Sequence, residues 1–138
     1  MRHARKDSRL LPTLCMLATI LVLSALTVGA RGQDAAAHKA WMDDAADLQD
    51  ELREQLLAKS GDKAAAAATQ IEELLARTQA YWAAKHADDI AAIARESRTL
   101  ATEAATAAKA GQFDRATEAA AMMAARCNAC HDLHPEKR

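Results

Sequence analysis

The sequence predicts an all-α protein whose four helices form an up-down-up-down antiparallel bundle. Beyond Gln33 the chain consists largely of Ala, together with Leu, Glu, Lys, Arg and Gln, which all favour helices. In this part of the chain the helix-breaking residues are Gly61, Gly111 and Pro135. Between these breaks apolar residues recur every three or four positions, which is the spacing of one helix face.

We expect the helices over residues 35–59, 63–86, 89–109 and 112–134. The interval from Gly61 to Gly111 is too long for one globular helix, and Ala87-Asp88-Asp89 offers a break with an aspartate that could cap the next helix. Short connections between long helices force neighbours to run antiparallel. The first two predicted core stripes are Trp41, Ala45, Leu48, Leu52 and Leu56, and then Ile71, Leu74, Leu75, Thr78 and Trp82.

The first 30 residues have the pattern of a cleaved export signal. A basic start is followed by an uncharged stretch of 21 residues, from Leu10 to Ala30, that ends in the small residues of a cleavage site. The stretch is also long enough to remain as an uncleaved membrane anchor. We therefore predict a signal peptide over residues 1–30, a periplasmic location and a mature domain over residues 31–138.

The mature part is one domain of 108 residues with a mildly acidic charge. Removing the four basic residues and one acidic residue of the signal from 18 and 19 leaves 14 and 18, a net charge of −4. Nucleic-acid binding usually requires a basic stripe, so we expect no nucleic-acid partner. After signal cleavage we also expect no membrane attachment.

Cys127-Asn128-Ala129-Cys130-His131, close to the C-terminus, is a C-x-x-C-H sequence. This is the attachment pattern of a c-type haem, in which each thiol adds to one vinyl group of the porphyrin and the histidine binds the iron. We therefore predict one heme c, held through Cys127 and Cys130, with His131 as an axial ligand. Helical spacing places the motif on the core-facing side of the last helix, so the haem would lie at one end of the bundle.

Two other interpretations of the motif are weaker. A redox dithiol of the thioredoxin kind accompanies a βαβ pattern, and this sequence has no strand pattern. Zinc could use Cys127, Cys130, His131 and His134, but structural zinc sites usually draw ligand pairs from separated segments.

The ligand on the other side of the iron decides the function. A strong sixth ligand gives an electron carrier, whereas an open position allows small gases to bind. Met42 is the leading candidate, because it lies near the predicted haem end of the first helix and close to its apolar stripe. His38, His86 and His134 compete with it, since each falls near the same end of the bundle.

These residues together resemble the class II c-type cytochromes, the cytochrome c′ family with its low-spin members. The resemblance covers the export signal, the four helices and the position of the motif near the C-terminus. It implies haem attachment at Cys127 and Cys130, ligation by His131, and Met42 in the place of the helix-one methionine of low-spin members. Unlike that family, this chain has His134 in place of an aromatic residue after the motif.

The expected function is single-electron transfer by an exported monohaem cytochrome with His131 and Met42 as iron ligands. Redox proteins would be its partners, and the resemblance adds a homodimer as a further option. We do not expect an enzyme. The alternative is a five-coordinate haem protein that binds small gases such as NO or CO.

Overall fold

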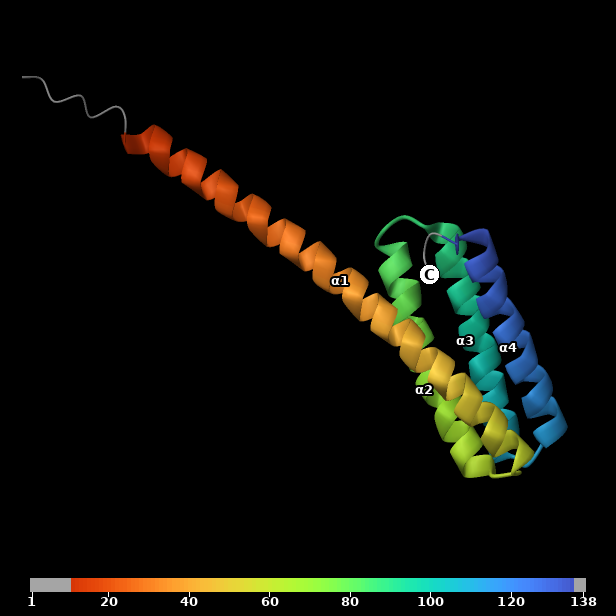
Figure 1. Cartoon of the computed structure of the whole chain (residues 1–138). Helices are drawn as coiled ribbons and strands as arrows, with labels where there is room; N and C mark the ends of the chain where they lie inside the picture. Colours follow the sequence, from red (N-terminus) through yellow and green to blue (C-terminus); the bar gives the residue numbers. More distant parts are fainter. Residues whose placement is uncertain (1–10, 136–138) are drawn as a thin grey trace, which may run out of the picture. The chain divides into compact units, whose positions relative to one another are not determined.

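The structure is a computed structural model that describes the backbone of residues 11–135 and the side chains of residues 34–135. Its helices are α1 (Leu11–Leu57), α2 (Gly61–Ala83), α3 (Asp88–Lys109) and α4 (Phe113–Leu133), and residues 11–135 contain no strand. The chain divides into two compact units, Met1–Ala37 and His38–Arg138 (Figure 1). The prediction of an all-α four-helix bundle is confirmed by the second unit.

The first helix begins earlier than predicted. We expected it from residue 35, but α1 is continuous from Leu11 and also covers most of the predicted signal. The basic start of that signal lies outside the described residues, as do the side chains of the uncharged stretch. Among the helical segments whose side chains are described, none is long and apolar enough to cross a membrane.

Three tight turns separate the four helices, and each uses a residue in the left-handed backbone region. Gly111 (φ 71°) ends α3, as its position in the sequence predicts. The amide of Gly111 donates to the carbonyl of Ala108 and that of Gln112 to the carbonyl of Ala107, which satisfies two free carbonyls of the helix end. The other turns place Lys59 (φ 52°) and His86 (φ 58°) in the same conformation.

The predicted aspartate cap of the third helix is wrong. The N-cap of α3 is Ala87, which has no side-chain hydrogen bond, and Asp88 and Asp89 fall in the first turn instead. There Asp89 Oδ1 accepts a hydrogen bond from the amide of Ile90 at 2.9 Å. Two carboxylates in the first turn still stabilise the helix, because they face the positive end of its dipole.

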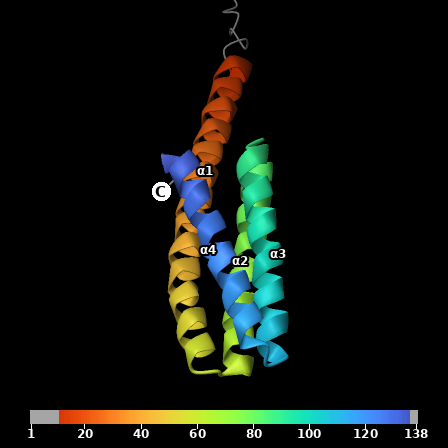
Figure 2. The same ribbon diagram turned by 90° about the vertical axis from the view of Figure 1, so that its right-hand side faces the viewer.

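In the second unit the four helices pack side by side with alternating direction (Figure 2). The closest backbone approaches are those of α2 to α3 and of α3 to α4. Small side chains explain this closeness, since buried alanines let two helix backbones come near each other. The buried alanines of α2 and α3 in the main core are Ala64, Ala65, Ala67, Ala68, Ala101, Ala104, Ala107 and Ala108.

At Gly61 the backbones of α2 and α3 approach each other very closely. A Cβ atom at Gly61 would lie 2.6 Å from the carbonyl oxygen of Ala108, a distance that real Cβ atoms do not show. The first residue of α2 must therefore be glycine for the backbones of α2 and α3 to meet there.

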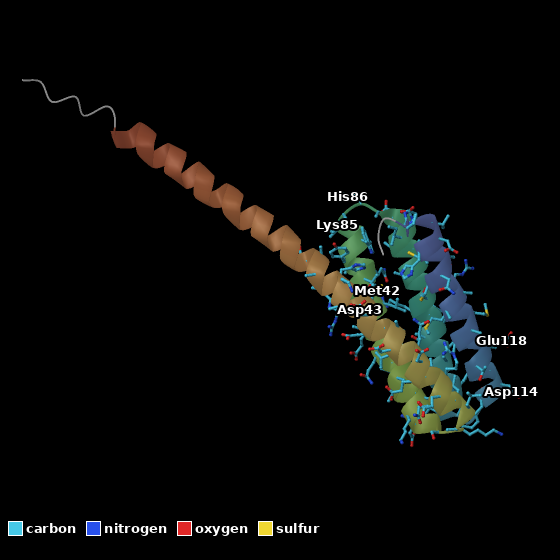
Figure 3. The ribbon with its side chains drawn as sticks, viewed as in Figure 1. Met42, Asp43, Lys85, His86, Asp114 and Glu118 are labelled. Carbon is cyan, nitrogen blue, oxygen red and sulfur yellow. The ribbon has the colours of Figure 1, made fainter. Side chains whose placement is uncertain are left out.

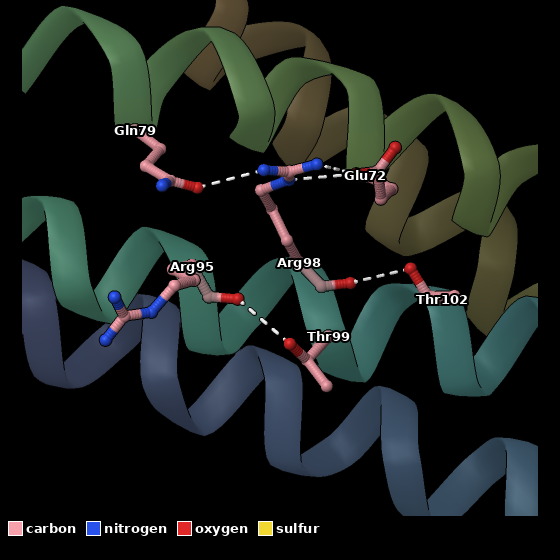
Figure 4. A network of polar contacts seen from close by, with 6 residues as sticks. All are labelled: Glu72, Gln79, Arg95, Arg98, Thr99 and Thr102. Atoms are coloured by element: carbon pink, nitrogen blue, oxygen red, sulfur yellow. Dashed lines mark hydrogen bonds and ion pairs between the residues drawn. The ribbon is translucent and has the colours of Figure 1, made fainter.

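Ion pairs add a second set of contacts to α3. Arg98 donates from Nε to Glu72 Oε1 at 2.8 Å and from an Nη atom to Gln79 Oε1 at 2.9 Å, so it holds two turns of α2 (Figure 4). On the other side Arg115 and Arg126 of α4 pair with Glu103 and Glu96 of α3. Hence α3 is fixed to both of its neighbours.

Candidate functional site

Both thiols of the C-x-x-C-H sequence face the inside of the bundle. Cys127 is half-buried and packs against the main core, while Cys130 packs against the smaller cluster of Trp82, Ile90 and Ala91. His131, the next residue on α4, is half-buried as well. The three predicted attachment and ligand residues of the motif therefore lie together at the end of the bundle where α2 ends and α3 begins.

The two thiols are free and are held in the protonated state. Neither forms a disulfide. Burial raises the pKa of the Cys127 thiol more than a hydrogen bond with Ser97 lowers it, and burial together with nearby Asp89 raises the pKa of Cys130. Catalytic dithiols depend on a lowered thiol pKa, so the surroundings of this pair do not favour redox catalysis.

Ser97 forms a hydrogen bond with Cys127, and it was not predicted from the sequence as part of the site. It is 1% exposed and its hydroxyl donates to the carbonyl of Ile93 at 2.9 Å. The sequence feature that could have indicated it is a polar residue in a stripe of alanines at helical spacing. This stripe is Ala94, Ser97, Ala101 and Ala104.

His38 of α1 is buried in a group of aromatic rings. The ring is stacked on Tyr81 at 4.6 Å between centroids, with an angle of 11°, and meets the edges of Trp41 and Trp82. Trp82 Nε1 donates a hydrogen bond to His38 Nε2 at 3.1 Å. Trp41, Tyr81 and Trp82 thus gather at this end of the bundle, where they contact one another and His38.

His38 also lies within electrostatic range of the motif. Its pKa is lowered first by burial and then by the nearby positive charges of His131 and Lys85. The imidazole of α1 is therefore neutral at pH 7, and it lies close enough to the α4 histidine for the charge of His131 to affect it.

Met42, one turn after His38, is half-buried on α1. It lies toward the end of the bundle that carries Lys85 and His86, far from Asp114 and Glu118 at the other end (Figure 3). This is the end where the motif lies, so the structure brings Met42 and His131 to one end from two helices.

The remaining two histidines differ in their surroundings. His86 is exposed in the turn after α2. His134 follows α4, and its Nε2 lies 3.1 Å from Asp89 Oδ2, which joins the end of α4 to the start of α3. Of the competing candidates for the sixth ligand, His38 is thus the one that is buried in the bundle.

An apolar cavity of about 240 Å³ opens between α1 and α4, starting one turn before Cys127. Leu52 and Leu56 of α1 and Met123 and Ala124 of α4 are among the residues that line it. Gln49 and Arg53 also line it, and the three motif residues are not among its lining residues, so the cavity is a groove between α1 and α4 beside the motif.

The motif residues have the side-chain chemistry that covalent haem attachment requires. Thioether formation needs two accessible thiols on one helix face and an imidazole beside them, and Cys127, Cys130 and His131 provide these. Within residues 34–135 no group of three or more His, Cys, Asp or Glu side chains is arranged to hold a metal ion.

Comparison of the chain with protein-family models, with curated proteins and with solved structures finds no match.

Proposed function

We propose that this chain is an exported monohaem c-type cytochrome that carries single electrons between redox partner proteins in the periplasm. The observation that supports it most strongly is the pair of free, inward-facing thiols of Cys127 and Cys130, with His131 beside them at the aromatic end of the bundle. A haem bound there supplies reversible one-electron chemistry at iron.

The protein's own residues have separate tasks in this proposal. Cys127 and Cys130 would hold the group, and His131 and Met42 would be its iron ligands. A thioether ligand from Met42 would favour the ferrous state and raise the reduction potential relative to two nitrogen ligands. Leu52, Leu56 and Met123 are buried in the core against which Cys127 packs, so this side of the attachment site is apolar.

The first experiment tests attachment. The full chain is produced in a bacterium that has a haem-attachment system, and the secreted product is analysed by mass spectrometry and by its pyridine haemochrome spectrum. We expect one covalently bound haem, and none in the variant with Cys127→Ala and Cys130→Ala. A secreted polypeptide with no haem, or with stoichiometric zinc in its place, would reject the proposal.

The second experiment separates electron transfer from gas binding. We expect the reduced protein to have a low-spin spectrum that changes slowly and incompletely under carbon monoxide. Met42→Ala should convert it to a high-spin form that binds carbon monoxide at once. Met122→Ala is the matched control, because Met122 lies on α4 and is 51% exposed. Immediate carbon monoxide binding by the unchanged protein would favour a five-coordinate gas-binding protein.

A further inference from the structure

His38 connects the helix of Met42 to α2 through a hydrogen bond and through ring stacking. Its side chain is 8% exposed, it accepts the Trp82 indole hydrogen bond at 3.1 Å, and it is stacked on Tyr81. Because Nε2 is an acceptor here, the proton of the neutral ring is on Nδ1. A hydrogen bond between two buried side chains 44 residues apart in sequence fixes the position of one helix against another.

The rest of the bundle holds α1 less closely. The nearest backbone approaches join α2 to α3 and α3 to α4, and the ion pairs of Arg98, Arg115 and Arg126 all have α3 as one partner. Near the motif, the rotation of α1 about its own axis therefore depends strongly on side-chain contacts such as those of His38.

Because Met42 follows His38 by four residues on the same helix, contacts that hold His38 in place also restrict the position of Met42. Residues four apart lie on nearly the same helix face, one turn from each other. A rotation or a sliding of α1 that displaces the His38 ring displaces the Met42 side chain in the same direction.

We propose that His38 is a positioning residue for Met42, held by Trp82 and Tyr81 so that the Met42 sulfur remains within reach of the haem iron. This inference rests on the proposed cytochrome function. His38 acts through Met42 and does not bind the iron itself, because its Nε2 lone pair is already occupied by the Trp82 indole.

The test compares variants of the haem-loaded protein by two readouts. One is the charge-transfer band of methionine-bound ferric haem, and the other is the rate of carbon monoxide binding to the reduced form. In His38→Leu we expect the band to weaken and the carbon monoxide rate to rise about fivefold, the factor that corresponds to losing one net hydrogen bond. His38→Gln keeps an acceptor for the Trp82 indole and should retain most of the band.

Two further variants keep the test decisive. Trp82→Phe removes the donor but keeps a ring, and should change both readouts in the same direction as His38→Leu, even if the latter folds poorly. His86→Gln is the matched control, because His86 is an exposed histidine at the same end of the bundle, and it should leave both readouts unchanged.

The possible results separate this inference from the proposed function. If His38→Leu and Trp82→Phe lower the melting temperature but leave the band and the carbon monoxide rate unchanged, His38 is only a packing residue and the inference is wrong. If the unchanged protein has covalent haem but no methionine band, and His38→Gln loses its low-spin spectrum, His38 is itself the ligand and the inference is overturned. If the protein acquires no haem, the proposed function fails as well.

Discussion

The two sides of this bundle are held together in different ways. Between α2 and α3 the interface consists of small side chains and close backbones, with Gly61 against the carbonyl of Ala108 and Arg98 joined to Glu72. α1, in contrast, contacts its neighbours through long or aromatic side chains such as Leu52 and His38, and an apolar cavity separates part of it from α4.

This difference indicates that one side of the bundle is rigid and the other can adjust. A close interface of alanines has little freedom to change, because any added volume must push two backbones apart. An interface of large side chains around a cavity can adjust. The helix with the candidate sixth ligand is thus the adjustable one, and the rigid group of α2, α3 and α4 contains both cysteines and His131.

The charged residues are also distributed unevenly between α1 and the rest of the bundle. Residues 34–57 contain seven acidic and two basic residues, whereas residues 58–138 contain eleven of each. The net negative charge is therefore concentrated in residues 34–57 of α1. Under the proposed electron-transfer function, partner proteins with a positive surface would be attracted to this segment.

The largest effect should come from adding the same volume to the two interfaces. Ala104 is fully buried on α3, and Ala45 is 5% exposed on α1. We expect Ala104→Leu to lower the free energy of unfolding by about 3 kcal/mol, because it overpacks a rigid interface. Ala45→Leu should cost less than about 1 kcal/mol, since α1 can shift. Urea unfolding of both variants checks this, and equal losses would show that the two sides are equally rigid.

Adding volume next to the cavity should instead increase the stability of the protein, and two neighbouring alanines of α4 can test this. Ala120 lines the space between α1 and α4, whereas Ala119 is 3% exposed in the packed core. Leu at position 120 should fill the cavity and raise the free energy of unfolding by about 1.5 kcal/mol. Ala119→Leu should be destabilising in the same urea measurement. A loss of stability in Ala120→Leu would mean that the cavity cannot accept a larger side chain.

Helical periodicity and the breakers were enough to predict the number of helices and their antiparallel order. Gly111 was predictable as a helix end because glycine adopts a positive φ without strain. The other two turns carried no such signal, since Lys59 and His86 adopt a conformation that their side chains disfavour. For this reason the predicted ends of the first two helices were two to three residues too late.

Substitutions in two of the turns should change the free energy of unfolding by an intermediate amount. Lys59→Gly should raise the free energy of unfolding by about 1 kcal/mol, because glycine removes the steric cost of the left-handed conformation. Gly111→Ala should lower it by a similar amount, about 1 kcal/mol. The thermal unfolding midpoints of the two variants should therefore move in opposite directions. No change in Lys59→Gly would mean that its Cβ is not strained in the turn.

The site was only partly predictable. The motif itself indicated Cys127, Cys130 and His131, because its chemistry lies in contiguous residues. The contact between His38 and Trp82 was not predictable in the same way, because it joins residues 44 apart and depends on how α1 and α2 rotate against each other. His38 and Met42 are four residues apart and share one helix face, so periodicity cannot decide which of them faces a bound group.

The smallest effect we predict concerns pH and the His38 ring. Burial, His131 and Lys85 lower the pKa of His38 in the folded state, so the unfolded chain takes up its proton first as the pH falls below about 6.5. The contribution of the neutral ring to stability is complete above that pH and is lost as the pH decreases toward the folded pKa. Between about pH 7 and pH 5 the unchanged protein should therefore lose more stability than His38→Gln, in which the side chain at this position does not titrate. Urea midpoints measured across this range would check it, and parallel curves for the two proteins would contradict the assignment of a buried neutral histidine to α1.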